Sequence, residues 1–222
     1  MRRPHSRMAN AKTRRTRRRT NAELYPVISV PDESIRFGTL TSCSLDPLAL
    51  CSMTELRDEP PRSLGDAKEI LLQQLSYYRG TVLAKLDGLR ADQLTASIVP
   101  SGWSPVGLLK HLVFVERRWM QWGFEAEQMP DPRGDEAPNG KGWLVRSDDN
   151  VADLAARWAA IATRTEAVAR NAQLTDRAKL GGRFSSDPPT LGWILAHLLQ
   201  EDARHVGHLD VVRELIDGNV GE

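Results

Sequence analysis

The sequence has too few cysteines for a disulfide framework. Its 222 residues contain two, Cys43 and Cys51, both in the N-terminal quarter. The rest of the chain offers neither a disulfide network nor a cysteine metal cluster, so we expect a reducing, cytoplasmic environment. Long hydrophobic runs are also missing, since no stretch approaches the ~18 consecutive apolar residues of a membrane span. These absences argue against a disulfide-stabilised secreted protein and against membrane insertion.

Strand patterns and a signal peptide are missing as well. No segment alternates apolar and polar residues over a convincing length. The basic start of the chain is followed by "YPVISVPDESIRFGTL", in which Pro, Asp and Glu interrupt any continuous apolar region. The sequence therefore predicts neither a β-sheet nor a secretory leader.

The charge that is present is divided unevenly along the chain. Residues 1–20 contain nine Lys or Arg and no acid, which leaves 21 basic and 29 acidic residues and a net charge of −8 for the remainder. An acidic body does not suit nucleic acid, so such a partner is expected at most for the tail. We interpret residues 1–52 as a basic, disordered extension. Regular periodicity follows Met53, which we predict to be the natural start of a domain over residues 53–222.

Helical periodicity dominates from residue 66 onward. Apolar residues recur at steps of three and four, which predicts four long helices and an all-α fold. The simplest arrangement is an antiparallel four-helix bundle with two long loops, at residues 126–149 and 172–187. The predicted helices are about Asp66–Leu89, Pro105–Glu125, Asn150–Asn171 and Pro188–Asp217.

Capping residues mark the ends of these helices. Ser104 precedes a proline at the first helical position, Asp187 does the same for the last helix, and Gly218 follows its end. The 126–149 loop is longer than most in compact domains, and such loops are usually functional or disordered. Its Trp143 is either a pocket wall or a plug on the end of the bundle.

Three of the five histidines fall in "HLLQEDARHVGH", residues 197–208. Residues one helical turn apart share a face, so His197 with Glu201, Glu201 with His205, or His205 with His208 can form half of a metal site. A third ligand must come from another helix, and His111 lies on or near an apolar face. Alternatively, the acid and histidines form an ordinary charged helix surface, and His111 is a hydrogen-bonded core residue.

The motifs "GWSPVGLLKHLVFVE" and "GWILAHLLQEDARHVGHLDVVRELIDG" resemble those of the DinB-like superfamily, most closely its mycothiol-transferase branch. The resemblance covers about residues 60–218. It implies a four-helix bundle that binds a divalent metal, zinc or nickel. Members commonly use three histidines, whereas Glu201 here stands where a histidine is expected. The chain is similar in this respect to mycothiol-dependent maleylpyruvate isomerase, and the implied ligands are His111, Glu201 and His205.

Further roles follow from the resemblance. His197, His208 and Glu116 are candidates to support the ligand side chains, and we name no catalytic residue beyond the metal site. The alternative for Glu116 is an ordinary helix charge that is solvated or salt-bridged. The implied cosubstrate is a low-molecular-weight thiol, mycothiol or bacillithiol, together with a small-molecule substrate. Relatives commonly dimerise, so a homodimer is one expected state, although no exposed seam indicates it.

Three functions of the predicted bundle remain open on these grounds, and a fourth possibility is nucleic-acid binding through the arginine-rich tail. The first is a metal-dependent thiol S-transferase, in which the metal stabilises a bound thiolate. The second is a hydrolase that activates water at the same site. The third is a metal- or ligand-binding bundle without catalysis.

Overall fold

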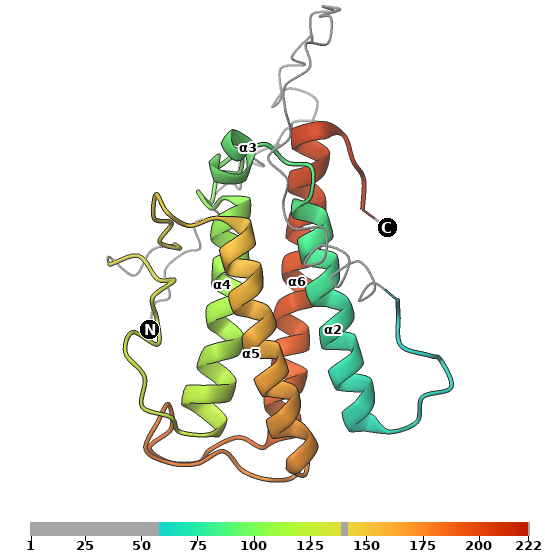
Figure 1. The fold of residues 1–222 in the computed structure, drawn as a ribbon, viewed down its shortest axis with the longest axis vertical. Coiled ribbons are helices and arrows are strands. Elements are labelled where there is room, and N and C mark those ends of the chain that lie inside the picture. The colour runs from blue at the N-terminus through green and yellow to red at the C-terminus, as the bar shows by residue number, and fades with distance from the viewer. Residues whose placement is uncertain (1–57, 139–141, 222) are drawn as a thin grey trace, which may run out of the picture. The chain divides into compact units, whose positions relative to one another are not determined.

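The computed structural model describes residues 58–138 and 142–221, and these residues form helices and no strands (Figure 1). The predicted all-α class is confirmed. The predicted extension and the predicted start at Met53 lie outside the described residues. In the described part of the chain, no helix combines the length and apolar character needed to cross a membrane. The elements are α2 (Ala67–Leu86), α3 (Ala91–Thr95), α4 (Pro105–Arg117), η3 (Arg118–Phe124), α5 (Val151–Asn171) and α6 (Leu191–Asp217).

The first long helix, α2, is shorter than predicted. It begins as expected, because the side chain of Asp66 accepts a hydrogen bond from the amide of Glu69 at 2.8 Å. It ends at Leu86 rather than at residue 89, because Gly88 turns the chain with a φ of +75°. The short helix α3 follows this turn and was not predicted from the sequence.

The second predicted helix divides into α4 and the π-helical turn η3. Ser104 caps α4 as expected, accepting from the amide of Gly107 at 3.3 Å, and Pro105 occupies its first position. The π-helical winding changes which carbonyls are bonded within the helix. The carbonyl of Trp122 accepts from the amide of Arg183 at 3.0 Å, so this turn is tied to the loop before α6.

The start of α6 differs from the prediction. Thr190, not Asp187, caps the helix, and its hydroxyl accepts from the amide of Trp193 at 3.3 Å. Asp187 has a φ of +44° and pairs with Arg177 instead, because the two prolines that follow it keep the chain extended up to Thr190. The predicted end at Gly218 is confirmed, with a φ of +76°.

The helices α4 and α5 run parallel, which corrects the expectation of a purely antiparallel arrangement. Lys110 Nζ lies 2.8 Å from Asp149 Oδ2 just before α5, and one turn and a half later Glu116 accepts from Trp158 Nε1 at 2.7 Å. The residue numbers therefore rise together along both helices. The loop between them is long enough to return the chain to the end at which α4 began (Figure 1).

In contrast, α4 and α6 run antiparallel. The rings of His111 and His205 have centroids 5.1 Å apart, whereas those of Trp119 and His197 are 4.4 Å apart. Residue numbers rise along α4 in the direction in which they fall along α6. This pairing places the middle of α4 beside the histidine-rich part of α6.

Apolar side chains from all four long helices form the core. Side chains such as Leu75, with 0% exposure, each contribute roughly 1.5–3 kcal/mol of burial free energy. On α5 the predicted inner face is buried, except that Val168 is only partly buried. Its buried members are Leu154, Trp158, Ile161 and Thr165.

Candidate metal centre

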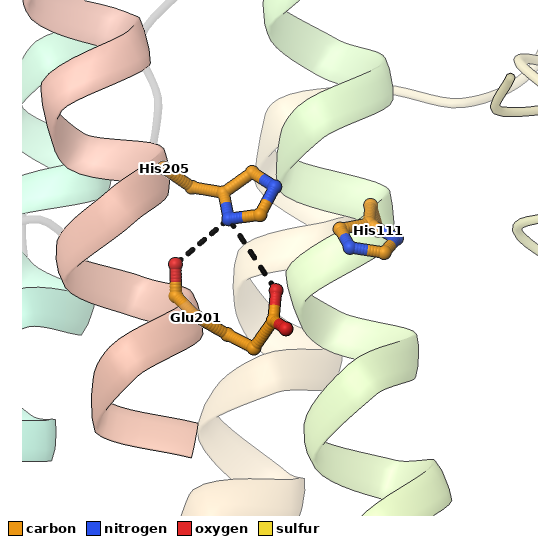
Figure 2. Close-up of side chains that lie close together, drawn as sticks. All are labelled: His111, Glu201 and His205. Atoms are coloured by element: carbon orange, nitrogen blue, oxygen red, sulfur yellow. Dashed lines mark hydrogen bonds and ion pairs between the residues drawn. The ribbon is translucent and has the colours of Figure 1, made fainter. Parts of the chain in front are cut away.

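The antiparallel contact between α4 and α6 brings together three of the predicted residues. Each of His111, Glu201 and His205 offers one ligand atom, and these three atoms lie within 4.8 Å of one another. Figure 2 shows His111 on one helix facing Glu201 and His205 on the other. Of the pairings that spacing left open on α6, the one formed by Glu201 and His205 lies opposite His111.

The ring of His111 is held by a carboxylate that the sequence did not reveal. Nδ1 of His111 lies 2.9 Å from Oδ2 of Asp135, and Asp135 is 0% exposed. Arg118 donates to the other carboxylate oxygen at 2.7 Å. Burial opposes ionisation of Asp135, but the hydrogen bonds from His111 and Arg118 outweigh it and hold the pKa of this carboxyl below its usual value. An ionised Asp135 accepts the Nδ1 proton, which leaves Nε2 with its lone pair.

Asp135 lies in the 126–149 loop, whose length was the one signal that pointed to function. The described parts of this loop are pinned by backbone bonds: the amide of Leu144 donates to the carbonyl of Asp135 at 2.7 Å, and Glu136 forms a bridge with Trp143. No periodicity marks a single acid in a loop, so spacing could not identify it.

Trp143 lies flat against the candidate centre. Its ring is stacked on the His111 imidazole, with centroids 4.4 Å apart and an interplanar angle of 18°. It also lies 5.6 Å from the ring of His205 and 6.1 Å from that of Trp103. Of the two interpretations of Trp143, these contacts favour a wall of the site.

His205 is oriented by its own helix. Its Nδ1 donates to the backbone carbonyl of Glu201 at 2.7 Å and lies 3.7 Å from the carboxylate of the same residue. The side chain is nearly buried, and this burial lowers the pKa of His205. A neutral imidazole with Nδ1 protonated keeps Nε2 available as a ligand, as at His111.

The donor set fits a divalent metal. Two neutral imidazoles and one carboxylate are common zinc ligands, which bind the ion at ~2.0–2.2 Å. Ligand atoms grouped within 4.8 Å are therefore on the scale of one centre. Three protein ligands also match the number in catalytic zinc sites, where a fourth position takes water or substrate.

The remaining histidines of α6 lie beside this group. Nε2 of His197 is 3.6 Å from the carboxylate of Glu201, so His197 lies beside a candidate ligand. Burial lowers the pKa of His197, which favours its neutral form. The ring of His208 lies edge-on to that of His205 at 5.3 Å, without a hydrogen bond between the two in the described residues.

Glu116 is a salt-bridged helix charge, the alternative to the predicted support of a ligand. It is buried, and its carboxylate accepts two hydrogen bonds from the guanidinium of Arg79, at 2.8 and 2.9 Å, and one from Trp158 Nε1. These bonds go to α2 and α5, not to a candidate ligand. Glu116 is thus part of a buried polar cluster that links helices, and Asp135 is the carboxylate that supports His111.

A sequence model of the mycothiol-S-transferase family matches residues 70–218. The chain belongs to the mycothiol-S-transferase family. The match spans the four long helices almost entirely and includes the three candidate ligands, Asp135 and Trp143. No curated protein was found as a relative of the chain. The assignment of the chain to this family therefore rests on the sequence pattern of the whole domain rather than on one near relative.

Proposed function

We propose that the protein is a metal-dependent mycothiol S-transferase. The observation that carries the proposal is the convergence of His111, Glu201 and His205 in a chain of this family. The four long helices are, in the same proposal, a DinB-like bundle. Zinc suits the three donors best, and nickel is the alternative that the resemblance implies.

The charge of the donor set supports thiol chemistry. Two neutral imidazoles and one carboxylate would leave a bound divalent ion with a net charge near +1. When bound, such an ion lowers the pKa of a coordinated thiol and so favours the thiolate. The reaction joins the thiol sulfur to an electrophilic carbon while the leaving group departs with its electron pair, and the thiol proton passes to solvent.

The residues of the chain orient the ligands and shield the site. Asp135, held by Arg118, fixes the tautomer of His111, and the carbonyl of Glu201 fixes that of His205. Trp143 covers one side of His111. Rigid ligands reduce the rearrangement that the reaction requires.

The family favours mycothiol over bacillithiol as the cosubstrate. Because mycothiol is a cytoplasmic thiol, the proposal also implies a cytoplasmic location. The homodimer remains a prediction.

A conjugation assay tests the transferase proposal. The full chain, supplied with zinc, is incubated with 1-chloro-2,4-dinitrobenzene, with and without mycothiol. We expect release of chloride and formation of the aryl thioether only when mycothiol is present. Release of chloride at the same rate without the thiol, with 2,4-dinitrophenol as the product, would indicate the hydrolase. Binding of the metal without turnover would indicate the non-catalytic bundle.

A further inference from the structure

Arg183 has no carboxylate partner among the residues that the structure describes. Its guanidinium lies over the ring of Trp119, with Cζ 4.1 Å from the ring centroid. Its Nη1 atom is buried without a hydrogen bond. Because an unpaired buried donor destabilises the folded chain, a cation held in this state calls for a functional explanation.

The backbone around Arg183 is fixed. Its amide donates to the carbonyl of Trp122 in η3, and the neighbouring Gly182 approaches that turn so closely that an added Cβ would lie 2.1 Å from the same carbonyl. Gln128 also donates to the carbonyl of Gly181 at 2.9 Å. The guanidinium is therefore presented by a well-anchored loop.

The surroundings of Arg183 leave a surplus of positive charge. Burial, followed by the charges of Arg118 and Arg133, lowers the pKa of Arg183, and the charge of Glu136 only partly opposes this; an arginine stays protonated at any physiological pH. Arg118 is paired with Asp135, and Arg133 with Glu136. Only Arg183 in this group lacks an anion of its own in the described structure.

One short series of contacts connects Arg183 to the candidate metal centre. Trp119 beneath the guanidinium contacts His197 with centroids 4.4 Å apart, and His197 lies 3.6 Å from Glu201. Arg118, whose charge acts on Arg183, binds Asp135, and Asp135 binds His111. The unpaired cation is thus a neighbour of the side chains that flank the centre.

An aromatic surface of Trp119, Trp193 and His197 adjoins the cation, and His197 is its member next to the centre. Trp193 is 52% exposed and stacks on His197, with centroids 5.2 Å apart and an interplanar angle of 9°. Trp119 is tilted against both rings. Stacked aromatic faces of this kind bind planar, conjugated molecules.

We propose that Arg183 and the surface of Trp119, Trp193 and His197 bind the electrophilic substrate as a planar, aromatic anion. The guanidinium pairs with its carboxylate, and the ring lies on the aromatic surface. This inference rests on the proposed transferase function. Mycothiol has no acidic group apart from its thiol, so the cation serves the electrophile rather than the cosubstrate.

A chloronitrobenzoate illustrates the reaction. The sulfur of mycothiol forms a bond to the ring carbon that bears chlorine, the carbon–chlorine bond breaks, and chloride leaves with the electron pair. The thiol proton passes to solvent, and the carboxylate is unchanged. Arg183 contributes binding and position only.

The first experiment measures binding without chemistry. Isothermal titration calorimetry of the zinc-supplied full chain compares 3-nitrobenzoate with the neutral 3-nitrobenzamide. We expect the anion to bind at least ~10-fold more tightly, which corresponds to about 1.4 kcal/mol. Arg183→Gln should reduce this ratio to near one, whereas Arg177→Gln, on the same loop but paired with the exposed Asp187, should leave it unchanged.

A charge-conserving variant covers the case in which Arg183→Gln fails to fold. Arg183→Lys keeps a cation near Trp119 but loses the bidentate guanidinium donor. The ratio of the affinities for 3-nitrobenzoate and 3-nitrobenzamide should therefore fall several-fold. A ratio that persists in either folded variant overturns the proposal, because the carboxylate would then be held elsewhere, for example by the metal. A ratio near one in the unmodified protein overturns it as well.

The second experiment separates this proposal from the transferase function. Mycothiol conjugation is measured with 4-chloro-3-nitrobenzoate and with its methyl ester, each rate divided by the uncatalysed rate. Conjugation of both without preference for the acid contradicts the anion site and leaves the transferase function intact. Anion-selective binding that depends on Arg183, without any conjugation, upholds the anion site and contradicts the transferase.

Discussion

The carboxylate of Asp135 joins two groups that matter to the candidate centre, the imidazole of His111 and the guanidinium of Arg118. His111 itself could be predicted, because a histidine near an apolar helix face within a recognisable motif is visible in the sequence. Asp135 could not be predicted, because one acid in a long loop has no periodic neighbours. Its position depends on how the loop folds back over α4.

Replacing Asp135 tests its support of the centre. We expect Asp135→Asn to weaken zinc binding by 10–100-fold, because His111 loses an anionic partner and Arg118 loses its buried counterion. Competition with a chromogenic chelator measures the affinity. Glu136→Gln, a neighbouring acid that is more exposed, should change it little. If Asp135→Asn bound zinc with an affinity within twofold of that of the unmodified protein, this carboxylate would not affect metal binding.

At the scale of elements, the ends of helices were predictable where a single residue sets the geometry. Ser104 and Gly218 have the roles expected of them. The start of α6 was misplaced because both Asp187 and Thr190 are good capping residues, and the sequence does not show which one adopts the required backbone conformation. The two prolines between them decide in favour of Thr190.

A pair of alanine variants distinguishes the two caps. Thr190→Ala should destabilise the protein by about 1 kcal/mol, because the hydroxyl no longer accepts from the amide of Trp193. In thermal unfolding, this loss lowers Tm by roughly 2–4 °C for a protein of this size. Asp187→Ala should have a much smaller effect, since its ion pair with Arg177 is exposed. Equal losses of stability in the two variants would contradict the assignment of Thr190 as the N-cap of α6.

The directions of the helices were harder to predict than the helices themselves. Periodicity identifies an apolar face but not its partner. A loop of some twenty-five residues, as between η3 and α5, can end at either end of the bundle. The parallel pairing of α4 and α5 is specified by long-range contacts such as Trp158 with Glu116, which only the folded chain reveals.

At the scale of the whole molecule, the buried polar cluster affects stability. Arg79 pairs with Glu116, while Asp202 on α6 is 5% exposed. Burial raises the pKa of Asp202 well above its ordinary value of 3.8; Arg79 opposes this rise, and the nearby Glu116 and Glu201 add to it. The folded chain therefore retains a proton that the unfolded chain releases.

This raised pKa predicts how stability depends on pH. The contribution of Asp202 is fully present below about pH 3.8 and is lost as pH rises toward the pKa of the folded state. Asp202→Asn removes this loss, so its Tm relative to the unmodified protein should increase between pH 4 and pH 7. Each kcal/mol corresponds to roughly 2–4 °C. Thermal unfolding of both proteins over this range measures the difference, and a constant difference would contradict a raised pKa.

The central claim is that His111, Glu201 and His205 hold one metal ion, and metal analysis of the purified full chain tests it most directly. After growth with added zinc or nickel, we predict close to one ion per chain, a loss of most of the metal in Glu201→Gln and His205→Ala, and full retention in the neighbouring His208→Ala. A folded, unmodified protein without near-stoichiometric metal would contradict the account. So would undiminished metal in Glu201→Gln.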